Sequence, residues 1–261
     1  MPPLKDILEI TFMGPGLVCI AVMLIGGGLG LAKRVRAHRA AAIERLTNEA
    51  TKLLVEGELV EAKAKAEQAV GLAHPRHARA TTRAHFCLGR ILGRLGELPE
   101  AEAHLAKAVD LDSEPHLRAL AAANLSMVLT RQGRSGEALD QAAKAMAIHD
   151  RLDYPEPFTR AGAGWANLAM SLALTDTGKD GLPAAEKALA IFDDQEIPDG
   201  MAHGYLAKAR ALQGKDNAAA FAAASEAHSR FIRLHAAIPS LYGDRLADSR
   251  KLLDLLGDAD W

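Results

Sequence analysis

From about residue 40 onward, small and apolar residues recur every three or four positions, with a glycine in a short polar stretch between runs. The stretch GELPEAEAHLAKAVDL, which begins at Gly96, shows this most clearly, with Ala101, Leu105 and Ala108 at helical spacing. This period predicts amphipathic helices that each bury one face. We therefore expect this part of the chain to be all-α.

The pattern repeats as units of two helices. Turn glycines at Gly57, Gly96, Gly133 and Gly214 divide the units, and Asp176 takes this place in the fourth. The fifth unit fits if its turn contains one extra residue. The five turns lie 39, 37, 43 and 38 residues apart. A period in this range, with two helices in each unit, is typical of a helical solenoid.

Small residues are expected where the two helices of a unit cross, since small side chains let helices approach closely. The predicted facing pairs are Ala50/Ala62, Gly89/Ala101, Ser126/Ala138 and Ala169/Gly181. A solenoid also needs a polar cap at its end. Residues 240–257 are expected to form this capping helix, which Gly257 ends.

The N-terminal part has a different pattern. Residues 10–32 are 23 consecutive residues without a charge. As a helix they would span about 35 Å, enough to cross a bilayer core of about 30 Å. A cleaved signal peptide is the alternative, although its apolar region would be shorter and a small-residue cleavage site would follow. We expect a tail at 1–9, a transmembrane helix at 10–32 and a basic juxtamembrane helix at 33–45 that continues into the first repeat.

The charges beside this segment predict its orientation. Four cations follow it, namely Lys33, Arg34, Arg36 and Arg39. Cations stay on the cytoplasmic side, so we expect a single-pass membrane protein with a cytoplasmic C-terminal domain. Arg, Ala and Gly usage favours a bacterial inner membrane, although mitochondrial outer-membrane receptors share this topology. Gly26 and Gly30 form a G-x-x-x-G pair, which would allow self-association or docking to another membrane helix within the lipid bilayer.

Composition narrows the function further. The chain has 31 Lys and Arg against 33 Asp and Glu, a net charge of −2, which argues against nucleic acid as a partner. Aromatic residues make up only 4% of the chain, which disfavours a β-sandwich. The two cysteines, Cys19 and Cys87, provide no disulfide framework.

The repeat units resemble tetratricopeptide repeats. The second unit carries the resemblance on Leu88, Gly89, Leu92, Gly96, Ala101, Leu105 and Ala108. The fourth adds Trp165 at the family's large aromatic place, and the longer third and fourth units resemble those of kinesin light chains. The resemblance implies a right-handed α-solenoid of about five helix pairs over 46–232. The expected fold class is therefore all-α: an N-terminal transmembrane helix, then this solenoid and a capping helix.

Motifs for catalysis are missing from the sequence. It contains no phosphate-binding loop, no H-E-x-x-H and no paired C-x-x-C. His74 and His77 fall in a predicted loop without two further ligands, and Cys87 has no obvious His partner. We therefore expect no enzyme activity, no cofactor and no metal.

In tetratricopeptide-repeat proteins the first helix of each unit lines a concave groove. Carried over by position, the peptide-groove residues would be Asn48, Arg83, Phe86, Arg90, Arg94, Asn124, Met127, Arg131, Asn167, Met170, Tyr205 and Lys208. The three asparagines would hold a peptide backbone, or else they are helix-surface residues that face water. The cations would bind acidic side chains, or else they pair with neighbouring Glu and Asp.

The resemblance thus implies a membrane-anchored scaffold or adaptor that binds another protein. Its ligand would be an extended acidic-hydrophobic peptide held in the groove. The alternative is a structural or accessory subunit of a multi-protein membrane complex, in which the span and the solenoid surface make permanent contacts.

Overall fold

The computed structural model describes residues 37–111, 114–152 and 157–257. The chain divides into two units, 1–42 and 43–261. Residues 37–42 of the first unit are helical. The second unit contains the repeats, and everything below concerns this unit.

The expected fold class needs one correction. None of the helices in the described ranges is long and apolar enough to cross a membrane. Even α8, which carries few charges, has Arg160 and Asp176 near its ends. The predicted tail, the transmembrane helix at 10–32 with its Gly26 and Gly30 pair, and residues 33–36 of the juxtamembrane helix lie outside the described residues. The described part of the chain is an all-α solenoid without a spanning helix.

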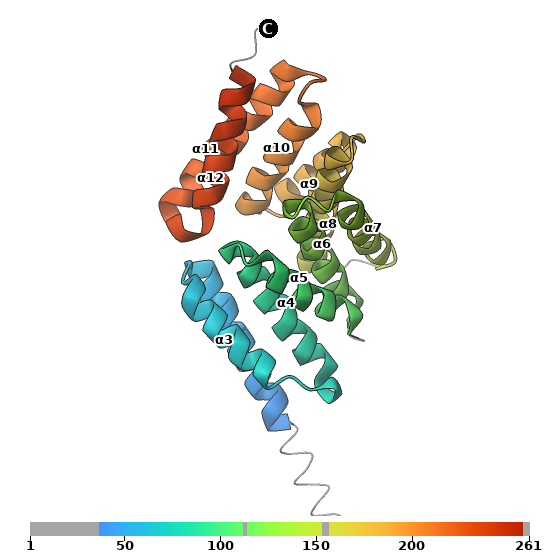
Figure 1. The fold of residues 1–261 in the computed structure, drawn as a ribbon, viewed down its shortest axis with the longest axis vertical. Helices are drawn as coiled ribbons and strands as arrows, with labels where there is room; N and C mark the ends of the chain where they lie inside the picture. The colour runs from blue at the N-terminus through green and yellow to red at the C-terminus, as the bar shows by residue number, and fades with distance from the viewer. Residues whose placement is uncertain (1–36, 112–113, 153–156, 258–261) are drawn as a thin grey trace, which may run out of the picture. The chain divides into compact units, whose positions relative to one another are not determined.

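Helices pair in chain order (Figure 1). Residues 43–56 are helical and precede α3 (Leu59–Gly71). The next pairs are α4 (Ala78–Leu95) with α5 (Leu98–Asp110), α6 (Pro115–Arg131) with α7 (Ser135–His149), α8 (Pro157–Asp176) with α9 (Leu182–Asp194), and α10 (Pro198–Leu212) with α11 (Asn217–Ala237). The single helix α12 (Pro239–Gly257) follows and packs on α11, and a short 3-10 helix, η2 (Pro75–His77), precedes α4.

Each pair turns on a glycine in the left-handed region. The five are Gly57, Gly96, Gly133, Gly178 and Gly214, with φ between 71° and 85°. A residue with a Cβ is strained in this conformation, which is why glycine is found here. In the second unit the Glu97 amide donates to the Leu92 carbonyl at 3.0 Å and so ends α4. The predicted place of Asp176 is wrong, because α8 continues through Asp176 and the turn residue is Gly178.

An alanine early in the second helix of every pair is completely buried. These residues are Ala62, Ala101, Ala138, Ala185 and Ala220. They follow their turn glycines by five residues in the first three units, by seven in the fourth and by six in the fifth. The fifth turn thus has the expected extra residue. The fourth turn has two, which the sequence analysis did not predict.

The predicted small pairs agree with this geometry in the second unit but not in the fourth. A Cβ on Gly89 would lie 3.2 Å from the Ala101 carbonyl oxygen and 2.6 Å from Leu105 Cγ, so α4 and α5 approach closely there. A Cβ on Gly181 would lie 2.4 Å from the Ser171 carbonyl oxygen. Gly181 therefore lies against Ser171, two residues beyond its predicted partner Ala169. Ala185 is the residue of the fourth unit that corresponds to Ala101 of the second.

The beginning of α12 contacts the first turn of the same unit. The Ser240 hydroxyl donates a 2.8 Å hydrogen bond to the Gly57 carbonyl oxygen. Leu241 packs against the apolar core of the first three pairs and against the core of α10, α11 and α12. This contact fixes α12 next to the inner sides of the earlier helices.

Candidate functional site

The first helices of four pairs, together with α12, surround a cavity of about 240 Å³. We call it the inner cavity. Its lining comes mainly from α4, α6, α8 and α10, with Leu105 from α5 and Arg245 from α12. Because these helices lie about one repeat apart in the sequence, only the stacking of the units brings their side chains together.

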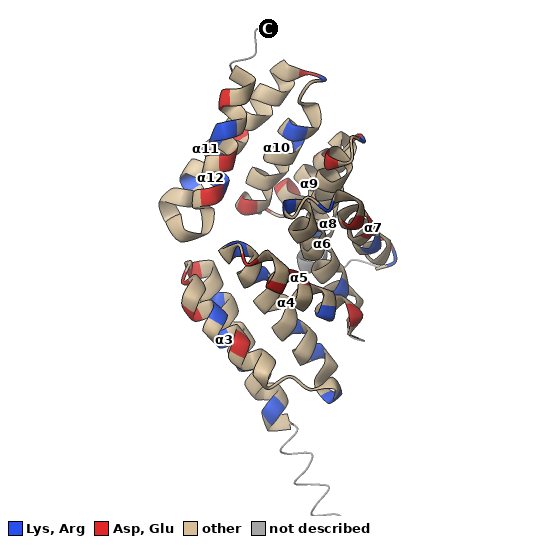
Figure 2. Cartoon of the chain, in the orientation of Figure 1, with Lys and Arg blue, Asp and Glu red and all other residues tan. Residues whose placement is uncertain are grey.

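Arginine dominates the charge of this cavity. Five arginines line it: Arg90, Arg94, Arg131, Arg210 and Arg245. Asp199 is the one carboxylate among the lining residues. The outer helices differ, because both signs of charge occur along α3, α5 and α7 (Figure 2). The cationic character is therefore local to the inner cavity and cannot be inferred from the net charge of the chain.

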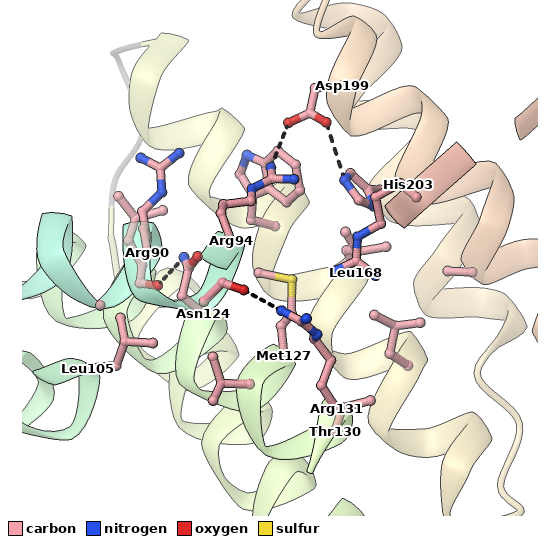
Figure 3. Close-up of a pocket in the computed structure, with 18 of the residues that line it drawn as sticks. Arg90, Arg94, Leu105, Asn124, Met127, Thr130, Arg131, Leu168, Asp199 and His203 are labelled. Carbon is pink, nitrogen blue, oxygen red and sulfur yellow. Dashed lines mark hydrogen bonds and ion pairs between the residues drawn. The ribbon is translucent and has the colours of Figure 1, made fainter. Parts of the chain in front are cut away.

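Asp199 links two helices across the cavity. One of its carboxylate oxygens lies 3.5 Å from an Arg94 nitrogen of α4, and the other lies 3.3 Å from His203 Nε2 on α10 (Figure 3). Burial opposes ionisation of Asp199, but His203, Arg94 and Arg90 outweigh burial and lower the pKa of this carboxyl. Burial lowers the pKa of His203 more than Asp199 raises it. Asp199 is thus the charged member of the pair at neutral pH.

The other arginines have weaker anchors. Arg90 lies over the Phe86 ring at 5.5 Å, and Arg131 donates to the Gly93 carbonyl (Figure 3). Arg245 contacts Asp248 at 3.4 Å on its own helix. Burial lowers the pKa of Arg245 to about 10, and the nearby positive charges of other arginines add to the shift. Burial and then Arg94 likewise lower the pKa of Arg90. Arg90 and Arg245 thus lie in partly buried positions near other arginines, whereas Arg131 is exposed.

The lining of the cavity also includes apolar side chains. Met127, Trp165, Leu168 and Leu172 contribute from α6 and α8. The Trp165 ring lies 5.0 Å from the Phe192 ring behind it, which fixes its orientation. A ligand here would meet both guanidinium groups and apolar surface.

Half of the predicted groove residues line this cavity. They are Phe86, Arg90, Arg94, Asn124, Met127 and Arg131. The other six, which are Asn48, Arg83, Asn167, Met170, Tyr205 and Lys208, do not. Their role toward a partner stays a prediction.

Several of these six side chains have partners within the chain. Arg83 donates to Asn48 at 3.1 Å, and Lys208 lies 3.0 Å from Glu186. Arg230 lies over the Tyr205 ring at 5.2 Å. Two of the predicted ladder asparagines also bond within their own helices. Asn124 donates to the Leu120 carbonyl at 2.8 Å and Asn167 to the Ala163 carbonyl at 2.9 Å.

The sequence analysis missed Trp165, Asp199, His203, Arg210 and Arg245 as cavity residues. A signal for three of them was present, because Asp199, His203 and Arg210 share one face of a helix at steps of four and seven. The extra residues in the fourth and fifth turns shifted the register counted from the turns, so the sequence analysis did not recognise this helix face. Counted from Gly178 instead of Asp176, Leu172 takes the place assigned to Met170, and Leu172 does line the cavity.

Comparison with known proteins supports the repeat assignment. Residues 79–151, which cover α4 through α7, match the family model for the tetratricopeptide repeat. No curated protein matches the chain.

Two solved structures show the similarity of the fold. One contains the nearly identical TPR-like repeats of a putative kinesin light chain from Podosopora anserina. It has 18% identity and a TM-score of 0.52, and the match covers 75% of this chain and 97% of that one. The other is a Rap protein in complex with the Competence and Sporulation Factor. It has 17% identity and a TM-score of 0.54, and the match covers 83% of this chain and 66% of that one. The described helices therefore form a tetratricopeptide-like solenoid.

Proposed function

We propose that this chain is a protein-interaction scaffold that holds a segment of another protein in its inner cavity. The segment combines acidic side chains with apolar ones. A tetratricopeptide-like solenoid favours such a role, because its stacked helices present a preformed concave surface. The matched Rap structure, which has the same fold, is itself in complex with a second molecule.

The observation that carries the proposal is that five arginines, one carboxylate and several apolar side chains line the same cavity. Guanidinium groups bind carboxylates through two parallel hydrogen bonds and are stronger partners when partly shielded from water. The apolar lining residues, such as Met127 and Leu168, would receive the apolar side chains of the segment. The small volume of the cavity limits the direct contact to a few side chains of the ligand.

Catalysis fits the cavity less well. Cys87 does not line it, and burial raises the pKa of this thiol, which keeps it protonated and poorly nucleophilic. Within the described ranges, no three His, Cys, Asp or Glu side chains lie together as metal ligands would. The membrane location expected from residues 10–32 is not part of the proposal.

A fluorescein-labelled peptide of alternating glutamate and leucine tests this function by anisotropy. We expect it to bind the full chain, and we expect the Arg90→Glu, Arg131→Glu double variant to bind at least about tenfold more weakly. Lys187→Glu with Arg233→Glu is the matched control, because both residues are exposed and neither lines the cavity. Equal loss in both double variants, or a glutamine-leucine peptide that binds equally well, would contradict the proposal.

A further inference from the structure

Three arginines of the inner cavity have no carboxylate partner. Arg90, Arg131 and Arg210 form no ion pair with any residue that the structure describes. They come from α4, α6 and α10, and all three line the same cavity. Arg90 and Arg210 are partly buried and Arg131 is exposed. Asp199 is the one carboxylate among the lining residues, so the cavity has an excess of positive charge that an anion would offset.

The last helix adds a fourth cation at the same place. The contact of Ser240 with Gly57 and the Arg94 guanidinium, 5.9 Å from the Tyr242 ring centre, hold the start of α12 against the earlier repeats. Arg245 of this helix then lines the cavity together with Arg210. The positive charge of the cavity thus comes both from the earlier repeats and from the last helix, and it is concentrated in a small volume.

A neutral donor also lies in the wall. The Thr130 hydroxyl lines the cavity, is buried, and has no hydrogen-bond partner among the residues that the structure describes. A buried hydroxyl without a partner costs free energy unless another group satisfies it. Its oxygen is closed to solvent, so an oxygen-rich ligand would accept its hydrogen only after the side chain rotates toward the cavity.

We propose that the inner cavity binds a compact polyanion that contains two linked phosphate groups. A diphosphate carries several negative charges within a few ångströms, which suits a cavity of about 240 Å³ that five arginines line. Each carboxylate carries a single charge, and a molecule with several carboxylates needs carbon atoms to connect them. Such a molecule therefore carries less negative charge than a diphosphate in the same volume. The diphosphate can come from an inorganic ion or from a nucleotide, and Trp165, which also lines the cavity, offers an aromatic surface for the latter.

Asp199 limits how strongly such an anion binds. Its carboxylate occupies Arg94 and adds negative charge to the wall of the cavity. A bound diphosphate must compete with it for this guanidinium. Removal of the Asp199 charge therefore strengthens binding, which is the reverse of what loss of an ordinary contact does. This inference concerns a small ligand and does not depend on the protein segment proposed above.

Isothermal titration of the full chain at low ionic strength, with inorganic pyrophosphate, ADP and citrate as probes, tests the proposal. We expect pyrophosphate or ADP to bind more tightly than citrate, and the tighter of the two identifies the source of the diphosphate. Arg90→Gln with Arg210→Gln should weaken binding about tenfold or more. Lys187→Gln with Arg233→Gln, which removes two exposed cations outside the cavity, should change it by less than about twofold.

Two variants of Asp199 complete the test. Asp199→Asn should tighten pyrophosphate binding about threefold or more, whereas Asp199→Glu, which keeps the charge, should not. Thermal unfolding of each variant, with and without pyrophosphate, checks that it is folded and gives a second measure of binding. The proposal is overturned if citrate binds as tightly as pyrophosphate, if neither diphosphate binds, or if the two double variants behave alike. The peptide experiment above has its own readout, so either proposal can fail alone.

Discussion

The Ser240 hydroxyl donates to the Gly57 carbonyl oxygen at 2.8 Å, although 183 positions separate the two residues. This single bond joins the turn of the first helix pair to the start of α12. Because α12 also carries Tyr242 and Arg245 toward the arginines of α4, the contact helps to build the inner cavity. The geometry of the site therefore depends on how the two ends of the unit meet.

Gly57→Ala tests this contact against a matched control. Gly57 and Gly96 have nearly the same φ, +85° and +82°, so alanine strains both by about 1 kcal/mol. A Cβ on Gly57 would lie 2.5 Å from Ile238 and from the Ser240 hydroxyl, whereas a Cβ on Gly96 would meet nothing within 4 Å. We expect urea unfolding to show a larger loss for Gly57→Ala, by about 1 kcal/mol or more. Equal losses would show that the contact of the ends contributes little.

Gly89→Ala tests the close approach of α4 and α5. The added Cβ would lie 2.6 Å from Leu105 Cγ, and Leu105 is completely buried, so the side chain has little room to move. We expect the free energy of unfolding to fall by about 1–3 kcal/mol. Gly136→Ala on α7 is the control, because nothing lies within 4 Å of its Cβ position. That variant should be as stable as the natural chain or slightly more so, since alanine favours a helix over glycine.

The buried position of His149 predicts that the folded chain loses stability in mild acid. It is 1% exposed, and burial, followed by the neighbouring His116, lowers its pKa to about 4, while Asp150 partly opposes the shift. The unfolded chain takes up a proton near pH 6.5 and the folded chain does not, so the stabilisation is complete above this pH and falls as the pH drops toward 4. Urea unfolding at pH 7.5 and pH 5 should differ by roughly 1–2 kcal/mol from this residue. His149→Asn should reduce the difference, and a difference that is unchanged would exclude His149 as its source.

The repeat architecture could be predicted because it depends on local signals. A glycine in each turn and an alanine five residues later follow from backbone strain and helix contact, and both can be read within one unit. The prediction for the fourth unit was wrong because Asp176 was assigned to the turn position that Gly178 occupies. That error of two residues displaced the predicted groove face in this unit from Leu172 to Met170.

The cavity itself could be predicted only in part. Arg90, Arg94 and Arg131 were found because their units have regular turns. Asp199 was missed because extra turn residues shift the register of its unit. Arg245 could not be found from the repeats, because it lies on α12, which reaches the earlier helices through a contact between residues far apart in the sequence. Nor does the sequence reveal that Arg94 pairs with Asp199, since 105 positions separate the two residues.

Site-specific photo-crosslinking in the cells of origin tests the central claim, namely that the inner cavity holds a segment of another protein. The crosslinker replaces Met127 within the cavity or, as a control, Val60, which is 72% exposed on α3. We predict a crosslinked second polypeptide from position 127 that disappears when Arg90→Glu and Arg131→Glu are added. Crosslinks from position 60 alone, or crosslinks from position 127 that survive the two charge reversals, would contradict the account.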